Sequence, residues 1–121
     1  MEMNSAVQYD LSYLNQVFQG NREMVNNIIS LFLQQVPKYV NEMEECVRKN
    51  EPLSLHPLAH KAKSSVAMLG IKDMEADIIQ IEQDSKYLRN LDGLPTLVNR
   101  VKRNCQIVYG QLVEAMQRPA A

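Results

Sequence analysis

The sequence predicts an all-α protein, an antiparallel up-down-up-down four-helix bundle with a short extra helix at its N-terminus. Apolar residues recur at steps of three or four through most of the chain, and no segment shows the strict two-residue alternation of a strand. The candidate helices are separated by short connections, which favour antiparallel neighbours around one core.

Capping and stop residues divide this pattern into five expected helices. Asp10, Asn21 and Ser54 are the expected N-caps, because their side-chain oxygens can accept hydrogen bonds from the N–H groups of a first turn. The expected helices are a short one between Asp10 and Gly20, a long one from Asn21 to Asn50, a third from Ser54 to near Gly70, a fourth to about Asn90 and a fifth from Leu94 to Arg118.

Three of these helices have features that their sequence predicts. Pro37 removes a backbone hydrogen bond from the second helix, but the apolar spacing continues through it, so we expect one kinked helix rather than two short ones. Pro57 is tolerated in the first turn of the third helix. The buried stripe expected in the fourth helix is Ile71, Met74, Ile78, Ile81 and Leu88.

Length and composition limit the class of protein. The 121 residues are expected to form one domain, 1–121, with a core between about 10 and 118. A net charge of -1 argues against nucleic-acid binding, and no apolar run or leader pattern predicts a membrane segment or secretion. We therefore expect a cytoplasmic protein. Cys46 and Cys105 lack a CxxC spacing and are expected to be buried free thiols.

One histidine of the third helix is expected to face away from the core. The residues on the opposite, core-facing side are Leu55, Leu58, Ala62, Ser65, Val66 and Leu69. His60, Lys63, Ser64 and Ala67 fall together on the other side at about 100° per residue. This pattern predicts an accessible imidazole with a lysine one turn away and small neighbours.

The chemistry expected at His60 is the transfer of a phosphoryl group. A neutral imidazole is a good nucleophile toward phosphorus, and Lys63 at i+3 can reach phosphate oxygens. No carboxylate lies at i±3 or i±4 of His60, so no base within this helix would activate water. The arrangement favours holding and passing on a phosphoryl group rather than hydrolysing its bond.

The chain resembles the histidine phosphotransfer (HPt) domain family, whose helical motif is H-x-x-K-G-S/A-S/A with a glycine about ten residues after the histidine. His60, Lys63, Ser65 and Gly70 match this motif, and Ser64 stands where the family usually has glycine. The resemblance covers most of the chain, from the YDLSYL segment to the Ile81-Glu82 pair.

The resemblance implies a phosphocarrier in a multistep two-component phosphorelay. His60 would accept a phosphoryl group from an aspartyl phosphate on one receiver domain and pass it to the aspartate of another. The implied partners are receiver domains of response regulators and hybrid histidine kinases. These receivers would bring the Mg²⁺, so no cofactor is expected on this chain.

The face around His60 is the expected docking surface, with Ser64, Ala67 and His56 as its contact residues. His56 and His60 are four residues apart and could share a metal ion. No Glu or Asp completes such a site on this helix, and Pro57 lies in the intervening turn, so no metal is expected. Outside this helix, Glu82 and Lys86 are interpreted as an ordinary surface pair rather than as site residues.

The sequence also bears on two other functions. A histidine kinase core is disfavoured because the chain has no room for a nucleotide-binding domain, no glycine-rich nucleotide box, and Lys61 where kinases usually place an acidic residue. The remaining alternative is a non-catalytic helical interaction module that binds receivers without phosphotransfer, favoured by Ser64. We expect a monomer, since one bundle can bury the apolar stripes, and a free-standing carrier, since the sequence begins at Met1.

Overall fold

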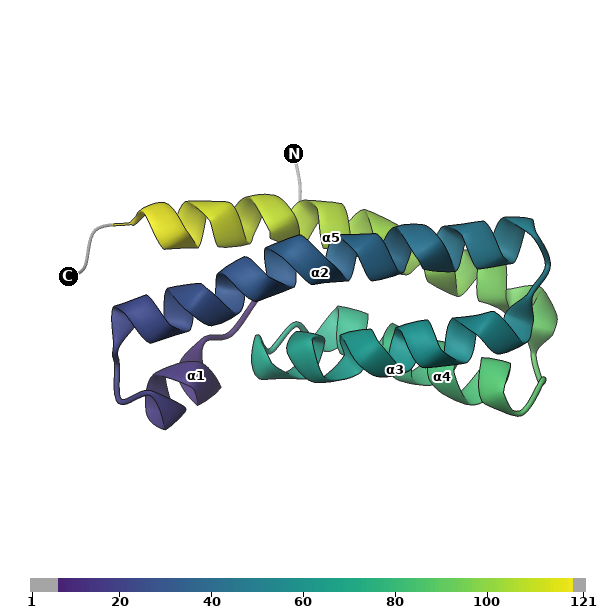
Figure 1. The fold of residues 1–121 in the computed structure, drawn as a ribbon, viewed down its shortest axis with the longest axis horizontal. Helices are drawn as coiled ribbons and strands as arrows, with labels where there is room; N and C mark the ends of the chain where they lie inside the picture. Colours follow the sequence, from purple (N-terminus) through teal and green to yellow (C-terminus); the bar gives the residue numbers. More distant parts are fainter. Residues whose placement is uncertain (1–6, 119–121) are drawn as a thin grey trace.

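The structure is a computed structural model that describes residues 7–118, and these residues form helices without any strand (Figure 1). The ends of the predicted domain, 1–6 and 119–121, lie outside the described residues. The elements are α1 (Ser12–Val17), α2 (Arg22–Arg48), α3 (Pro52–Met68), α4 (Lys72–Lys86), the one-turn 3₁₀ helix η1 (Leu91–Gly93) and α5 (Leu94–Gln117). The predicted all-α bundle with a short first helix is confirmed.

The four long helices form a closed ring of neighbours. α2 contacts α3, α3 contacts α4, α4 contacts α5, and α5 contacts α2, while the short α1 packs against α2 (Figure 1). The line of contact between α3 and α4, which we call the α3/α4 seam, therefore lies on the opposite side of the bundle from the contact between α2 and α5, the α2/α5 seam. A reactive group on one seam is remote from the other.

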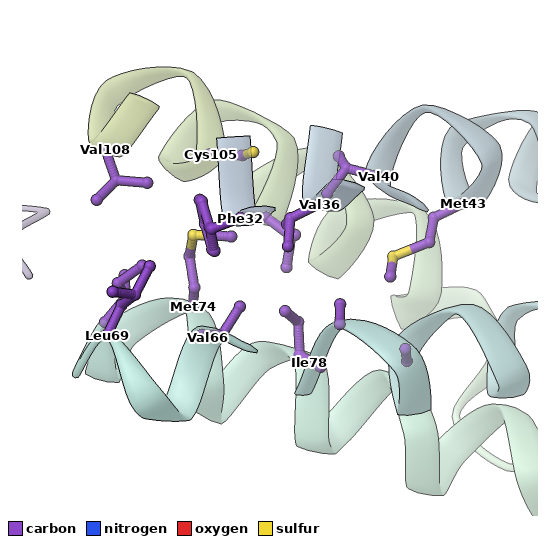
Figure 2. Close-up of a cluster of buried hydrophobic side chains, with 14 of the residues drawn as sticks. Phe32, Val36, Val40, Met43, Val66, Leu69, Met74, Ile78, Cys105 and Val108 are labelled. Atoms are coloured by element: carbon purple, nitrogen blue, oxygen red, sulfur yellow. The ribbon is translucent and has the colours of Figure 1, made fainter. Parts of the chain in front are cut away.

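The core consists of the apolar stripes that these helices turn inward (Figure 2). Burying a large aliphatic or aromatic side chain contributes about 1.5–3 kcal/mol, so the stripes account for much of the driving force for folding. The core side chains labelled in Figure 2 are Phe32, Val36, Val40, Met43, Val66, Leu69, Met74, Ile78, Cys105 and Val108.

The long second helix is confirmed as one element. α2 runs through Pro37 without interruption for 27 residues, and Val36 and Val40 on either side of the proline are fully buried. The side chain of Asn21 accepts a hydrogen bond from the N–H of Met24 at 3.1 Å, as a helix N-cap does. The continuous apolar phase therefore outweighed the hydrogen bond lost at the proline.

Two predicted N-caps are wrong. α3 begins at Pro52 with Glu51 at the cap, because proline is well suited to a first helical turn and moves the start ahead of Ser54. The cap residue of α1 is Leu11 rather than Asp10. The carboxylate of Asp10 nevertheless accepts a hydrogen bond from the N–H of Ser12 at 2.9 Å.

The end of the fourth helix is also predicted wrongly. α4 ends at Lys86, and Leu88 is 51% exposed with a left-handed backbone, φ +52°. The N–H of Arg89 donates back to the carbonyl oxygen of Asp84 at 2.9 Å, which closes the helix in a Schellman-type turn. This turn rotates Leu88 out of the apolar stripe to which its spacing assigned it.

Gly70 ends α3 at a point where another segment crosses closely. Its φ is +62°, and the N–H of Asp10 donates to the carbonyl oxygen of Leu69 at 2.8 Å. A Cβ at Gly70 would lie 2.7 Å from the Cβ of Asp10 and 2.8 Å from its carbonyl oxygen. Glycine is therefore required both by the left-handed backbone and by the contact with the segment that precedes α1.

The two cysteines are free thiols, as predicted, but they differ in burial. Cys105 is buried in the core, and burial raises the pKa of its thiol to about 11. Cys46 is only half-buried, and its pKa is raised mainly by burial. Both raised pKa values disfavour the reactive thiolate at neutral pH.

Candidate functional site

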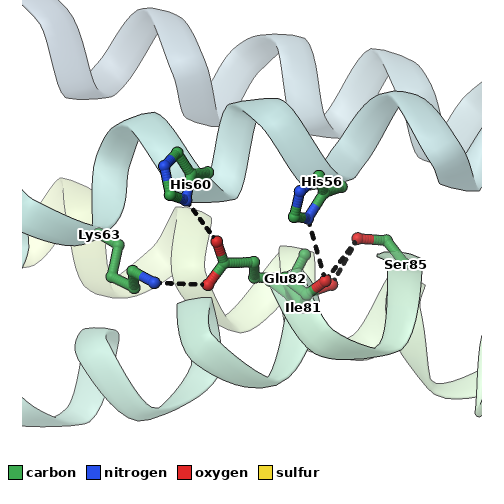
Figure 3. Close-up of polar contacts among 6 residues, drawn as sticks. All are labelled: His56, His60, Lys63, Ile81, Glu82 and Ser85. Carbon is green, nitrogen blue, oxygen red and sulfur yellow. Dashed lines mark hydrogen bonds and ion pairs between the residues drawn. The ribbon is translucent and has the colours of Figure 1, made fainter. Parts of the chain in front are cut away.

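His60 lies on the outer face of α3, as the helical spacing predicts. Its side chain is 66% exposed, whereas Ala59 and Ala62 beside it in the sequence are fully buried. These small buried residues let α3 pack closely against its neighbours while the imidazole stays at the rim of the α3/α4 seam. Figure 3 shows the ring next to α4 rather than pointing into the core.

A carboxylate from α4 joins His60 to Lys63. The Oε2 atom of Glu82 lies 2.6 Å from Nδ1 of His60, and its Oε1 atom accepts a hydrogen bond from Nζ of Lys63 at 2.8 Å (Figure 3). The Glu82 side chain is only 5% exposed. The interpretation of Glu82 as a surface partner of Lys86 is therefore wrong, because the packing of α4 against α3 turns this carboxylate toward the histidine.

The Glu82 carboxylate is ionised at neutral pH. Burial raises its pKa, but the hydrogen bonds and charges of Lys63 and His60 outweigh burial, and the pKa lies below the ordinary value of 4.5. His60 and Lys63 on α3 thus balance the buried negative charge of Glu82. The two hydrogen bonds also fix the position of the carboxylate.

The hydrogen bond to Glu82 determines which nitrogen of His60 carries the proton. An ionised carboxylate can only accept hydrogen bonds, so Nδ1 must donate. In the neutral ring, Nε2 then holds an unshared electron pair, and it lies on the side of the ring away from Glu82 (Figure 3). The site therefore presents a nucleophilic nitrogen to the solvent with no proton to remove first.

His56 lies one turn before His60 at the same seam. Its Nδ1 atom is 3.4 Å from the backbone oxygen of Glu82, and the two imidazole centroids are 6.1 Å apart. Ser85 is fully buried and donates to the backbone oxygen of Ile81 at 2.6 Å. The structure thus places His56 beside the site, while its predicted docking role stays a prediction.

The other predicted contact residues are accessible. Ser64 and Ala67 are both exposed on α3, one and two turns beyond His60, and the side chain of Lys63, which precedes Ser64, is 35% exposed. Whether a partner touches Ser64 or Ala67 stays a prediction. The absence of a metal site is also still a prediction, although residues 7–118 hold no group of three or more His, Cys, Asp or Glu side chains arranged for a metal ion.

Sequence reasoning located two of the three groups that meet at this site. His60 and Lys63 share one helix, so their spacing predicts a common face. Glu82 comes from α4, and its position depends on how α4 packs against α3, which spacing within one helix does not specify. The available signal was its place at the edge of the apolar stripe of the fourth helix.

No helix within residues 7–118 combines the length and the apolar character needed to cross a membrane.

Comparison with known proteins establishes the fold. No protein-family model and no curated protein sequence matches the chain. Its structure has the fold of a histidine-containing phosphotransfer protein. It is similar to the crystal structure of histidine-containing phosphotransfer protein B (HptB) from Pseudomonas aeruginosa PAO1, with a TM-score of 0.82 and 16% sequence identity over 96% of this chain and 100% of that chain. The predicted resemblance to the HPt family is confirmed in the fold.

Proposed function

We propose that this protein is a histidine-containing phosphocarrier of a multistep phosphorelay, with His60 as the phosphoacceptor. The observation that carries the proposal is the 2.6 Å contact between Nδ1 of His60 and the buried carboxylate of Glu82, on an exposed helix face. This contact leaves Nε2 as an accessible nucleophile. The fold shared with a histidine-containing phosphotransfer protein supports the same function.

The proposed donor is an aspartyl phosphate on a receiver domain. The electron pair of His60 Nε2 attacks phosphorus, the N–P bond forms, and the P–O bond to the aspartate breaks so that the aspartate leaves as a carboxylate. No proton moves, because Nδ1 already holds it. Delivery to a second receiver is the same displacement in reverse, with the new aspartate as nucleophile.

Glu82 and Lys63 stabilise different charges of the phosphorylated histidine. The phosphorylated ring with its Nδ1 proton carries a positive charge, which the Glu82 carboxylate stabilises across the hydrogen bond. Lys63 is partly exposed on the same face, and its ammonium group can turn from Glu82 to the phosphoryl oxygens. The carrier itself thereby supplies a positive charge, on Lys63, to the negatively charged phosphoryl oxygens.

The same geometry explains why a carrier would keep its phosphoryl group in water. Hydrolysis is accelerated when a base activates the attacking water. The Glu82 carboxylate is hydrogen-bonded to the ring, but on the side of Nδ1 and not of Nε2. Its side chain is only 5% exposed, and both of its oxygens already accept hydrogen bonds. It is therefore not placed to deprotonate a water molecule that approaches phosphorus.

The proposal includes the setting of the carrier. Its partners are receiver domains of response regulators and hybrid kinases, which supply the Mg²⁺ of the reaction, and the carrier itself works as a cytoplasmic monomer without metal or cofactor. It has no autonomous kinase activity. Incubation with ATP alone should leave it unlabelled, and labelling under that condition would contradict this part of the proposal.

The experiment that tests the function is transfer from a receiver charged with acetyl phosphate. The wild-type protein should acquire acid-labile, base-stable phosphate, and His60→Gln should acquire none while remaining folded by circular dichroism. His56→Gln is the matched control, since it removes the other histidine of α3 and should keep the label. Labelling of His60→Gln would contradict the proposal, and binding of receivers without any transfer would favour the interaction module.

A further inference from the structure

The turn that ends α4 presents apolar side chains to the solvent. Tyr87 is 57% exposed and Leu88 is 51% exposed. The backbone of Leu88 is in the left-handed region, at φ +52°, and this conformation costs free energy in a residue with a Cβ. Because the Leu88 side chain is exposed, its burial does not offset this cost.

The turn is fixed by a buried carboxylate. Asp84 is 3% exposed and accepts hydrogen bonds from Nε of Arg89 at 3.2 Å and from Nδ2 of Asn90 at 3.3 Å. Burial raises the pKa of Asp84, but its hydrogen bonds with Gln80, Asn90 and Arg89 outweigh burial and hold the pKa below its ordinary value. The charged Asp84 thus holds Tyr87 and Leu88 in one arrangement.

Cations surround the exposed aromatic ring. The Nζ atom of Lys86 and the guanidinium carbon of Arg89 each lie 5.4 Å from the ring centroid of Tyr87. The turn therefore combines an apolar centre with a basic rim. A complementary surface would carry apolar side chains bordered by carboxylates.

The turn is close enough to His60 to lie under the same partner. Lys86, the last residue of α4, is four residues beyond Glu82, which corresponds to about 6 Å at the helical rise, and Tyr87 and Leu88 follow it directly. A standard interface covers about 800 Å² on each partner, equivalent to a disc of about 16 Å radius. A receiver centred on His60 at the α3/α4 seam therefore reaches this end of α4.

We propose that the Tyr87–Leu88 turn is a docking element for the receiver that exchanges phosphate with His60, and that it contacts an apolar receiver face with an acidic rim. This inference rests on the proposed function, because that function requires a protein body over this seam. The free-energy cost of the left-handed backbone at Leu88 is offset if the Leu88 side chain becomes buried in the complex.

Leu88→Asn separates docking from folding. Asparagine tolerates the left-handed region, so this variant should raise the Tm by about 3–5 °C. It should also raise about tenfold the concentration of phosphorylated receiver that gives half-maximal transfer, because one good interface anchor is lost. The transfer rate at saturating receiver should not change. A residue with only a structural role would not weaken docking while the protein becomes more stable.

The companion variants and the controls complete the test. Tyr87→Ser should raise the half-saturating concentration similarly, whereas Tyr109→Ser, which removes a 42% exposed tyrosine at the α2/α5 seam, should not. Chemical phosphorylation by phosphoramidate should be unchanged in all variants. The receiver used is the one that transfers fastest to the wild type in a panel.

Two failures are distinguishable. An unchanged half-saturating concentration in both Leu88→Asn and Tyr87→Ser would overturn the docking element and leave the carrier function intact. If no receiver transfers to the wild type although phosphoramidate labels His60, the proposed function itself fails, and the docking element fails with it.

Discussion

At the scale of single residues, the proton of the His60 ring is placed by a side chain from a different helix. Glu82 accepts the Nδ1 hydrogen bond at 2.6 Å and is held in turn by Lys63 at 2.8 Å. Because the carboxylate is buried and ionised, the ring is held in one tautomer before a partner arrives. Preorganisation of this kind lowers the cost of reaching the reactive geometry.

Replacing Glu82 tests this role. Glu82→Gln keeps the size of the side chain but removes its charge, and Glu82→Ala removes both hydrogen bonds. A hydrogen bond to a charged group contributes about 1.5–3 kcal/mol, so Glu82→Ala should slow transfer from a receiver by roughly 10- to 100-fold, with a smaller loss in Glu82→Gln. Rapid-quench measurement of the transfer rate at saturating receiver checks this, and an unchanged rate in Glu82→Ala would exclude the role.

The pH dependence of stability provides a second test at Glu82. A carboxylate whose pKa is lowered by folding contributes stability that is present above its unfolded pKa and is lost as the pH falls through its folded pKa. The ordinary pKa of a glutamate side chain, 4.5, stands for the unfolded state, and the pKa of Glu82 in the folded protein is lower. The difference in unfolding free energy between wild type and Glu82→Gln should therefore narrow as the pH falls below 4.5.

Denaturant titrations of both proteins from pH 7 to pH 3 measure this difference. Asp84 has a lowered pKa as well, but it is present in both proteins and cancels in the comparison. A difference that grows as the pH falls below 4.5 would have the wrong sign for this account.

At the scale of the elements, the contact between α3 and the segment before α1 requires a glycine. Gly70→Ala should destabilise the protein by about 2 kcal/mol or more, because the new Cβ meets Asp10 and the backbone is left-handed. Gly110→Ala is the matched control within α5, where nothing lies within 4 Å of the new Cβ. It should stabilise the protein by about 0.5–1 kcal/mol. Thermal unfolding should give a lower Tm for Gly70→Ala and a higher Tm for Gly110→Ala. Equal changes of Tm in the two variants would contradict the close contact at Gly70.

The element scale also shows what the sequence can predict. The apolar stripe of α3 and the exposure of His60 follow from 3.6-residue periodicity within one helix. The structure confirms both, except that Ser65 of the predicted stripe is only half-buried. Glu82 could not be located in the same way, because its position depends on the packing of α4 against α3. Leu88 was misplaced because the turn closed by Asp84 ends α4 before the apolar spacing stops.

At the scale of the whole molecule, the bundle separates a reactive seam from a supporting one. His60 and Glu82 meet at the α3/α4 seam, while α2 and α5 close the bundle on the opposite side. The packed core between them, with Phe32 and Ile78 essentially inaccessible to solvent, resists small rearrangements. The phosphoryl group should therefore be carried on a rigid scaffold.

A comparison of free and phosphorylated protein tests this rigidity. After phosphorylation by phosphoramidate, amide chemical shifts should change in α3 and α4 near His60 and stay nearly constant along the α2/α5 seam. The His56→Gln variant should give the same pattern away from its own site. Large shifts throughout α5 would instead indicate a conformational switch and would contradict the rigid carrier.

In the proposed carrier, the phosphoryl group resides on Nε2 of His60, and the proton on Nδ1 faces Glu82. Long-range ¹H–¹⁵N spectra of the imidazoles, recorded on the receiver-phosphorylated protein, test it most directly because they distinguish the two ring nitrogens. The account predicts phosphorus on Nε2 of His60 and an unmodified His56 ring. Phosphorus on Nδ1 of His60, or on His56, would contradict it.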